Sequence, residues 1–317
     1  MLKDEVLKIL ESNRPRFTSG QELAKQSGVT RAAIWKAVNS LIADGHEIEA
    51  VTAKGYRLRD DSDVLTAAGI TARMQHKCEV RVYDCVESTN KTAKLAAIDG
   101  AAANTIIAAD EQTAGKGRRG RSFYSPKSTG VYFSVILKPN VTAEKSVLVT
   151  TAAAIAAADA IEKLTGRTAL IKWINDVYVD GKKCVGILTE AIFDYESGGI
   201  DSVVVGIGIN VTTDDFPDDV AMRAGCVGKV SRNALIAETC DKLIELTGRL
   251  PDASYLDEYR SKCFVLGKRI RVIGNSNEYE ATVLSVDDSG GLVVGTDDGT
   301  TLTLSNEEVS VRICGNR

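Results

Sequence analysis

The chain has 317 residues, of which 44% are hydrophobic and 26% charged, and its formal net charge is −4. These values are typical of a folded protein of two or three domains, and they exclude a disordered or collagen-like chain. No apolar run approaches the ~20 residues of a membrane helix. The charged first residues do not resemble a signal peptide.

The cysteines and histidines indicate which metal sites and catalytic groups this chain does not have the residues to form. The seven cysteines are scattered without a Cys-x-x-Cys pair, which favours reduced thiols in a cytoplasm over disulfides or a zinc site. The two histidines, His46 and His76, are far apart in the sequence. We therefore expect neither a histidine metal cluster nor histidine-based acid–base catalysis.

Positive charge is concentrated near the N-terminus. From Arg14 to Arg59 there are eight basic and four acidic residues, so this segment carries +4 on a chain whose total is −4. A basic module on an acidic body is one way to bind nucleic acid with one end of a protein.

The basic segment has the pattern of a helix-turn-helix. Ser19 and Glu22 form a capping-box pattern, Gly28 is a natural helix end, and Thr30 can cap the next helix. The expected core stripe of the second helix is Ile34, Val38, Leu41 and Ile42. Its opposite face shows Arg31, Trp35, Lys36 and Asn39.

Two short strands, at 48–51 and 56–58, follow with a basic turn between them, which predicts a wing. A small helical domain for protein contacts is the alternative, but motif, wing and charge together favour DNA binding. The expected DNA-binding residues are Thr30, Arg31, Lys36, Asn39, Lys54 and Arg57.

Residues 60–63 are expected to form a linker, after which the strand and helix patterns alternate. Helices are predicted at 89–97, capped by Ser88, at 150–164 and at 233–247. Strands are predicted at 80–83, 105–110, 131–137, 170–173, 176–179, 183–190 and 203–211. The fold class is α+β, with a central mixed-sheet α/β domain.

From about residue 267, short strands and turns indicate a small SH3-like β-barrel, which closes over a ligand or simply packs on the body. Its expected core is Val272, Val283, Val286, Val293, Leu302, Leu304 and Val309. The predicted domains are 1–62, a winged helix-turn-helix; 63–266, the central body; and 267–317, the barrel.

The stretch after the 105–110 strand is the most informative. Gly115, Gly117 and Gly120 match the spacing of a dinucleotide-binding loop, but no helix pattern follows, so we reject that interpretation. The intervening positions carry Lys116, Arg118, Arg119 and Arg121. Two alternative interpretations are a solvated basic loop and an additional DNA-binding surface. The alternation of glycines with cations favours a site for a bound anion.

Three weaker patterns follow. Residues 172–176, Lys-Trp-Ile-Asn-Asp, form a turn in which Asp176 could hold Mg²⁺, while Trp173 is more typical of a core. Lys183 enters an apolar strand and needs an anionic partner. Residues 206–210, Gly-Ile-Gly-Ile-Asn, would let a flat ligand lie close, although Asn210 alone is more typical of a turn.

Together these motifs resemble the biotin–protein ligase family, and with the N-terminal module the chain resembles its bifunctional ligase and biotin operon repressor class. The resemblance covers nearly the whole chain. It is carried by residues 87–90 (Glu-Ser-Thr-Asn), by Gln112 with 115–121, by 172–176, by Lys183 with Gly186, and by 206–210.

The resemblance implies an ATP- and Mg²⁺-dependent enzyme that makes biotinyl-5′-AMP and transfers biotin to a lysine of a biotin carboxyl carrier protein. It implies catalytic roles for Lys183, Arg118 and Asp176, the last near the metal or the incoming lysine. The implied biotin residues are Ser88, Thr89, Asn90, Gln112, Gly115, Lys116, Gly117, Arg118, Lys183 and Gly186. The implied nucleotide residues are Arg118, Arg119, Arg121, Phe123, which would stack the adenine, Lys172, Asn175 and Asn210.

Three positions depart from the family's pattern: Lys116 stands for a frequent Arg, Phe123 for Trp and Ile174 for Pro. None of these three replacements removes a charged side chain.

The implied reaction requires cations on physical grounds as well. A carboxylate and a phosphate ~4 Å apart repel by about 4 kcal/mol at an effective dielectric near 20, so positive charge must lie near both.

The resemblance also implies partners and a switch. The adenylate would order the 115–121 loop and favour a homodimer that carries two winged modules to operator DNA. The alternatives are a regulator with a non-catalytic sensor body, a lipoate–protein ligase and, last, a dinucleotide oxidoreductase.

Overall fold

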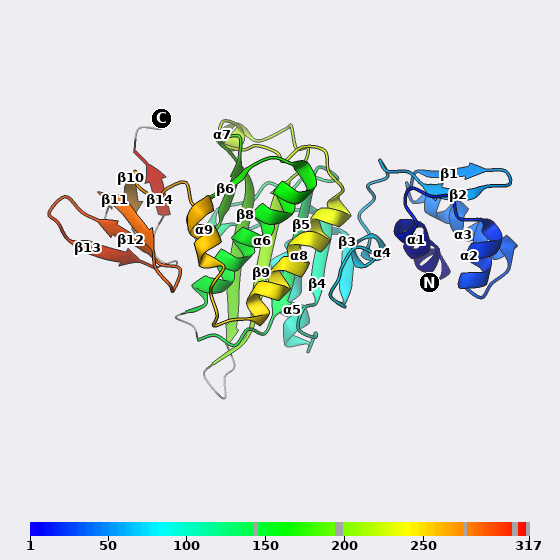
Figure 1. The fold of residues 1–317 in the computed structure, drawn as a ribbon, viewed down its shortest axis with the longest axis horizontal. Coiled ribbons are helices and arrows are strands. Elements are labelled where there is room, and N and C mark those ends of the chain that lie inside the picture. Colours follow the sequence, from blue (N-terminus) through cyan, green and yellow to red (C-terminus); the bar gives the residue numbers. More distant parts are fainter. Residues whose placement is uncertain (143–144, 194–198, 275–277, 306–309, 315–317) are drawn as a thin grey trace.

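The computed structural model describes residues 1–142, 145–193, 199–274, 278–305 and 310–314. Figure 1 shows the N-terminal helices at one end, the C-terminal strands at the other and the central sheet with its helices between them. Within the described ranges, no helix is long and apolar enough to cross a membrane. All seven cysteines are free thiols.

The N-terminal module is a winged helix-turn-helix. It consists of α1 (Leu2–Ser12), α2 (Gly20–Gln26), α3 (Arg31–Ala43) and the antiparallel strands β1 (Ile48–Val51) and β2 (Gly55–Leu58). Both predicted caps are present: the Ser19 and Thr30 hydroxyls accept hydrogen bonds from the amides three residues on, at 3.1 and 3.2 Å. Gly28, with φ +63°, makes the turn before α3.

One predicted core residue of α3 is wrong. Ile34, Val38 and Leu41 are buried, but Ile42 is 43% exposed, and Ala37 packs inside instead. The spacing of 34, 38 and 41 already defines the buried stripe, and the next position, at 100° per residue, turns away from it.

The wing is fixed to the loop before α2. Thr18 and Tyr56 exchange both backbone hydrogen bonds, at 2.8 and 2.9 Å. Gly55 has φ +108°, and a Cβ there would lie 2.2 Å from the Thr18 carbonyl oxygen. The wing therefore has one position relative to the helices, and position 55 requires glycine.

The predicted linker is held tightly. Arg232, the first residue of α8 (Arg232–Gly248), is 5% exposed. Its guanidinium contacts Asp63 of the linker at 2.9 Å and Asp110 of the central sheet at 2.5 Å. The next side chain, Asn233, accepts a hydrogen bond from the Thr66 amide at 3.1 Å.

A buried carboxylate joins the N-terminal module to the central body. Glu11 of α1 pairs with Arg14 at 2.8 Å and with Arg73 at 2.7 Å, and Arg73 follows the short helix α4 (Ala67–Thr71). Ala68 of α4 packs in the N-terminal core, while Ile70 packs in the central core. The two cores therefore meet at α4.

The central body is built on a seven-stranded mixed sheet in the order β3-β4-β5-β9-β8-β7-β6. Among the strand pairs that the structure describes, β3 and β4 pair in parallel and the others are antiparallel. The strands are β3 (Val80–Val86), β4 (Ile106–Gln112), β5 (Gly130–Leu137), β6 (Ala169–Lys172), β7 (Asp176–Val179), β8 (Lys182–Phe193) and β9 (Ile200–Asn210).

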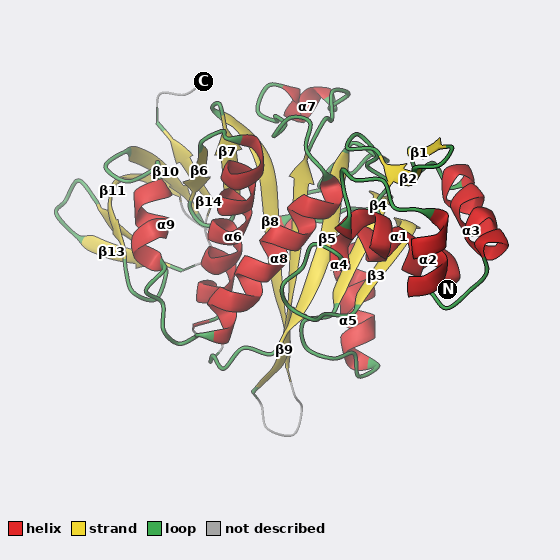
Figure 2. Cartoon of the chain, turned by 45° about the vertical axis from the view of Figure 1, so that its right-hand side comes forward, coloured by secondary structure: helices red, strands yellow, loops and turns green. Residues whose placement is uncertain are grey.

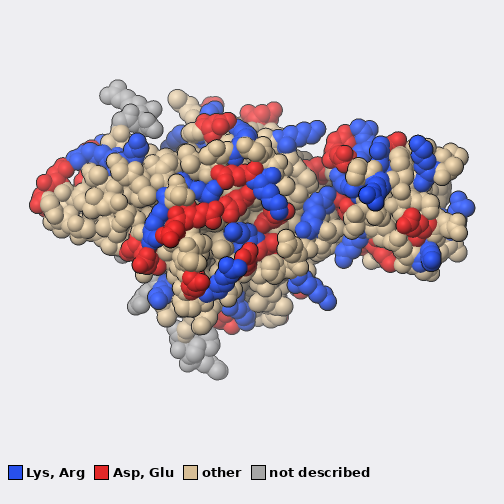
Figure 3. Space-filling view, in the orientation of Figure 1, with Lys and Arg blue, Asp and Glu red and all other residues tan. Residues whose placement is uncertain are grey.

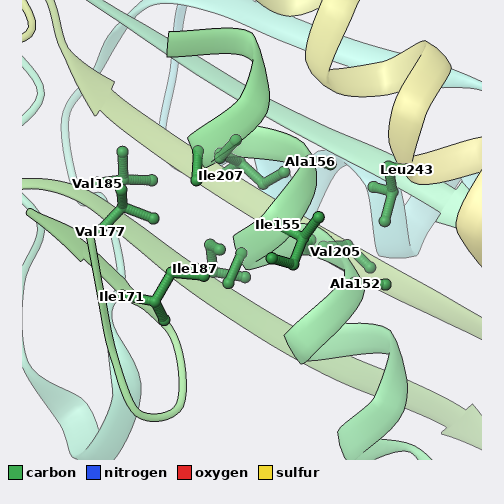
Figure 4. Close-up of a cluster of buried hydrophobic side chains, with 14 of the residues drawn as sticks. Ala152, Ile155, Ala156, Ile171, Val177, Val185, Ile187, Val205, Ile207 and Leu243 are labelled. Carbon is green, nitrogen blue, oxygen red and sulfur yellow. The ribbon is translucent and has the colours of Figure 1, made fainter. Parts of the chain in front are cut away.

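Helices cover both faces of this sheet. On one face lie α6 (Val147–Thr165), α8 and α9 (Leu256–Lys262), visible in front of the strands in Figure 2. Figure 4 shows Ala152, Ile155 and Ala156 of α6 packed against valines and isoleucines of β7, β8 and β9. On the other face, α5 (Thr89–Ile98) packs on Ile107, whereas its neighbours Ile106 and Ala108 face the main core. This alternation is the period of two expected of a strand.

The C-terminal residues form a five-stranded antiparallel sheet in the order β13-β12-β11-β10-β14. Its strands are β10 (Arg269–Ile273), β11 (Glu278–Val286), β12 (Leu292–Gly295), β13 (Thr301–Leu304) and β14 (Ser310–Ile313). Two predicted core residues are wrong: Val293 is only partly buried and Leu302 is 38% exposed. Leu292 and Val294 point inward instead, and Val309 lies outside the described residues.

Candidate active site

The basic loop that follows β4 folds back on itself and leads into no α-helix. Gly115 accepts a hydrogen bond from the Phe123 amide at 2.9 Å, and the Gly117 amide donates to the Arg121 carbonyl at 2.7 Å. Between them, residues 118–120 make a single 3₁₀ turn with Arg119 at φ +57°. This confirms that the glycines do not open a dinucleotide-binding helix.

Gly115 is required by a close approach. A Cβ there would lie 2.4 Å from the Phe123 carbonyl oxygen and 3.0 Å from the Gln112 amide nitrogen. The glycine therefore brings the returning strand of the loop against the end of β4.

A neutral cluster of hydrogen bonds lies at that end of β4. The Gln112 side-chain carbonyl accepts from the Thr89 amide at 2.9 Å and from the Thr89 hydroxyl at 3.2 Å. Its NH₂ group donates to the Ser125 hydroxyl at 2.9 Å, and that hydroxyl donates to the Phe123 carbonyl at 3.0 Å. The second N–H of this NH₂ group has no partner among the described residues, so it is open to a ligand. We call Ser88, Thr89, Gln112 and Ser125 the amide cluster.

Ser88 is the N-cap residue of α5, as predicted, but its side chain makes no capping hydrogen bond. The residue is 2% exposed, and its hydroxyl makes no hydrogen bond with any residue that the structure describes. A hydroxyl so enclosed normally finds a partner, so it is open to a ligand.

Asn90 is held by hydrogen bonds within the protein. Its NH₂ group donates to the Leu188 carbonyl at 3.1 Å and to Glu190 at 2.8 Å, and its oxygen accepts from Ser134 at 2.6 Å. Both N–H groups are used, and this side chain ties α5 to β5 and β8.

Two cations are held by the turn between β6 and β7. Lys183 Nζ lies 2.5 Å from Asp176 Oδ1, and Arg118 donates to the side-chain oxygen Oδ1 of Asn175 at 3.2 Å. Lys183 thus has the anionic partner expected from its place in an apolar strand. We call Arg118, Lys172 and Lys183 the cation cluster.

Burial makes the charged forms of Lys172 and Arg118 less favourable, so both side chains would gain from a nearby anion. Burial lowers the pKa of Lys172, Asp176 opposes the shift, and Lys183, Arg312 and Arg121 reinforce it. Burial also lowers the pKa of Arg118, which Asp176 again opposes. A bound anion would favour the charged form of each side chain.

Phe123 lies between the two clusters, and its position corrects one expectation. A Cβ on Gly208 would be 2.4 Å from the Phe123 ring, and one on Gly186, opposite it in the sheet, would be 3.0 Å away. The space that the glycines were expected to leave for a flat ligand is therefore filled by this ring. On the same strand, Asn90 occupies the space above Gly206.

Gly186 is where the clusters meet. The same added Cβ that would touch the Phe123 ring would lie 3.6 Å from Lys183 Cε. The Phe123 carbonyl is bonded to Ser125. Phe123 is thus hydrogen-bonded to the amide cluster, and its ring lies over the same glycine as the Lys183 side chain.

Asn210 ends β9 and is 4% exposed. Its NH₂ group donates to the Gly225 carbonyl at 3.1 Å, while its buried oxygen has no partner among the described residues. The Gly225 amide donates to the Lys183 carbonyl at 2.9 Å. Residue 225, which follows the short helix α7 (Asp218–Ala221), therefore links Asn210 to Lys183.

Sequence reasoning missed Ser125, Ser134 and Gly225. Ser125 precedes a proline within a loop and Ser134 lies in an apolar strand, so neither had a pattern of its own. Trp173 is buried, as expected, and its indole N–H donates to the Gly290 carbonyl at 3.0 Å.

The remaining basic residues of the loop lie at its rim. Arg119 donates to the Ile273 carbonyl of β10 at 3.0 Å, so the loop contacts the C-terminal sheet. Arg121 and Lys116 are exposed. No group of three or more potential metal ligands occurs in the described part of the chain, and Asp176 is a single carboxylate held by a lysine.

The predicted DNA-binding residues all belong to the N-terminal module, where Figure 3 shows separate basic patches among uncharged and acidic side chains. Arg31, Lys36 and Asn39 are exposed on α3, and Lys54 is exposed on the wing. Arg57 is paired with Glu49, opposite it on the wing, and lies 4.7 Å from the centre of the Phe17 ring.

Comparison with known proteins agrees with this arrangement. Residues 82–210 match the Biotin/lipoate A/B protein ligase family, and residues 3–57 match an HTH domain. The bifunctional ligase/repressor BirA of Bacillus spizizenii is 33% identical over 94% of this chain and 95% of its own length. That of Escherichia coli is 27% identical over 93% of each.

A solved structure is also similar. The biotin protein ligase from Aquifex aeolicus in complex with biotin and ATP has a TM-score of 0.64 and 26% identity, covering 74% of this chain and 99% of that one. By its sequence over nearly full length, its ligase core and its N-terminal helix-turn-helix, the chain belongs to the BirA family of bifunctional biotin ligase/repressors.

Proposed function

We propose that this protein is an ATP-dependent biotin–protein ligase that is also a biotin-responsive transcriptional repressor. It would make biotinyl-5′-AMP and transfer biotin to a lysine of a biotin carboxyl carrier protein. The observation that carries the proposal is the meeting of the amide cluster and the cation cluster at Phe123 and Gly186. The three proposed units are residues 1–62, 63–266 and 267–317.

The amide cluster supports a site for the biotin ring system. A cyclic urea needs donors to its oxygen and acceptors for its N–H groups. The unpartnered Ser88 hydroxyl and the remaining N–H of Gln112 supply such groups in an enclosed place. The proposed contacts include the backbone at Gly115, Lys116 and Gly117, with Thr89 and Asn90 holding the cluster in shape.

The cation cluster supports a site for the biotin carboxylate and the α-phosphate of ATP. Arg118 and Lys183 would exchange Asn175 and Asp176 for these anions, and Lys172 would face the phosphates. Arg119 and Arg121 would contribute from the rim. The free oxygen of Asn210 suits the amino group of adenine, and Phe123 would offer the adenine its uncovered side.

The reaction follows from this charge arrangement. A carboxylate oxygen of biotin attacks the α-phosphorus, and pyrophosphate leaves. Arg118 and Lys183 neutralise two anions that would otherwise repel, and they stabilise the charge that spreads over the phosphoryl oxygens. The carrier lysine, as a neutral amine, then attacks the acyl carbon and AMP leaves. No side-chain nucleophile is needed.

The donor set suits Mg²⁺ only in part. Magnesium in nucleotide enzymes is held by one or two carboxylates together with substrate phosphates. Asp176 would provide one carboxylate once Lys183 moves to an anion, and the ion would supply Lewis-acid neutralisation of phosphate charge. A basic loop that orders over the adenylate would slow its hydrolysis.

The ligase activity is tested directly. The full chain is incubated with biotin, MgATP and a carrier protein; pyrophosphate release, biotinyl-adenylate in the mass spectrum and a biotinylated carrier are expected. Lipoate in place of biotin should give none of these. Absence of pyrophosphate with biotin would leave a ligand-sensing regulator, and turnover with lipoate alone would indicate a lipoate ligase.

The repressor activity requires a second copy, because one short helix reads few bases. We propose a homodimer that the adenylate favours and that carries two winged modules to a two-fold operator in the cytoplasm. Sedimentation and electrophoretic shift, each with and without biotin plus MgATP, test this. Equal DNA affinity in both conditions would remove the switch.

A further inference from the structure

Trp35 is a large apolar side chain on the outer face of α3. It is 59% exposed, and its indole N–H has no hydrogen-bond partner among the residues that the structure describes. Ala32 and Asn39, its neighbours one helical turn away on either side, are also exposed. More than half of the Trp35 side chain is therefore open to solvent.

The surroundings of Trp35 are cationic. Arg31 and Lys36 are exposed beside it on α3, and Lys54 projects from the wing. Lys54 and Arg57 lie 5.9 and 4.7 Å from the centre of the Phe17 ring, which holds both cations on the wing. A polyanion that contacts Arg31 and Lys36 on α3 would bring its surface against the indole between them.

Its position in the helix matches that of a base contact. Trp35 is the fifth residue of α3, within the N-terminal half that enters the major groove in helix-turn-helix proteins. The apolar group exposed in the major groove is the C5-methyl of thymine. An exposed indole can cover that methyl, whereas it gains little from phosphate.

We propose that Trp35 is a sequence-reading residue that covers a thymine methyl group in the operator. This inference rests on the proposed repressor function and adds to it the base that α3 recognises. The cations nearby would set affinity for any duplex, and Trp35 would set preference among duplexes.

The test begins with duplexes selected from a random pool by the full-length protein with biotin and MgATP. Each thymine of the selected duplex is then replaced by deoxyuridine, which lacks only the methyl group, and the Kd is measured by fluorescence anisotropy. For the wild type, one thymine in each half-site should weaken binding by about fourfold when replaced, the loss expected for one buried methyl group.

The variants assign this effect to the indole. In Trp35→Ala the deoxyuridine effect at that thymine should vanish, while Trp35→Phe should keep part of it. Ile42→Ala is the matched control, because Ile42 is 43% exposed on the same side of α3 two turns later. It should keep the full effect. Circular dichroism and ligase activity should be unchanged in all three.

Each other outcome overturns a distinct claim. If Trp35→Ala shows the same deoxyuridine effect as the wild type, Trp35 does not read that base. If Trp35→Ala weakens the dimer in sedimentation and leaves the deoxyuridine effect unchanged, the indole is a subunit contact. If no duplex is enriched, the repressor function itself fails, and the inference fails with it.

Discussion

The amide cluster and the cation cluster meet at Phe123, yet they are built in opposite ways. In the amide cluster, Gln112 and Ser125 are locked by neutral hydrogen bonds that a ligand would add to. In the cation cluster, Lys183 and Arg118 are held by polar groups of one turn, which a ligand anion would replace. One half is therefore assembled before binding, and the other must exchange partners. Substitutions in the two halves should affect different kinetic constants.

The largest effect is expected in the cation cluster. Lys183→Met should lower kcat for adenylate formation by about 10²–10³-fold, because a charge aimed at the transition state is lost. Pyrophosphate release measures it. Lys182→Met is the control, since Lys182 is exposed and adjacent strand residues point to opposite faces. Equal losses in both variants would contradict the role of Lys183.

The loop that joins the clusters should be the next most sensitive element. In Gly115→Ala the new methyl group would lie 2.4 Å from a backbone oxygen, so the loop must shift, at about 1–3 kcal/mol. Both KM for biotin and kcat should suffer. At Gly117 the corresponding distance is 3.4 Å, and Gly117→Ala should be nearly silent. A silent Gly115→Ala would show that the loop is not fixed at this point.

A smaller and more selective effect is expected in the amide cluster. Ser125→Ala removes one partner of Gln112 and should raise KM for biotin by about two- to tenfold, from a net hydrogen-bond contribution of ~0.5–1.5 kcal/mol. KM for ATP and kcat should change little. Ser122→Ala, at an exposed position of the same loop, should leave all constants unchanged. A parallel rise in both KM values for Ser125→Ala would mean that the clusters are not separate.

The smallest effect concerns pH. Burial lowers the pKa of Lys172 in the folded chain, while the unfolded chain keeps the ordinary value of 10.5. Between these two values the unfolded state binds more protons, so the free energy of unfolding should rise with pH. Lys172→Met should lack this rise in urea titrations. Saturating ATP should also flatten it in the wild type, because phosphate restores the charged form. A wild type and variant with parallel pH profiles would contradict the assignment.

The sequence could predict those features that depend on local chemistry. The caps at Ser19 and Thr30, the turn at Gly28 and the need of Lys183 for an anion are all decided within a few residues or by burial alone. The charge of the basic loop was equally readable, because glycines alternating with cations restrict the alternatives.

Features that depend on distant pairing could not be predicted. The ring of Phe123 fills the space above Gly208 because β8 and β9 pair in a register that sets Gly186 opposite Gly208. Nothing near residue 123 encodes that register. The exposure of Leu302 was also not predictable. A four-residue strand shows too little alternation to indicate which face is buried, and its pairing with distant strands decides this.

The sharing of Arg232 by Asp63 and Asp110 bears on where this protein can be cut. A fragment that starts at residue 63 keeps both carboxylates, so the strand carrying Gln112 retains its support. A fragment that starts at residue 67 deletes Asp63 and leaves the guanidinium with one partner fewer in an enclosed position. These two truncated ligases differ by four residues, yet only the longer one keeps full support for the strand that carries Gln112. A loss of turnover in the shorter fragment would therefore not by itself mean that the winged module takes part in catalysis.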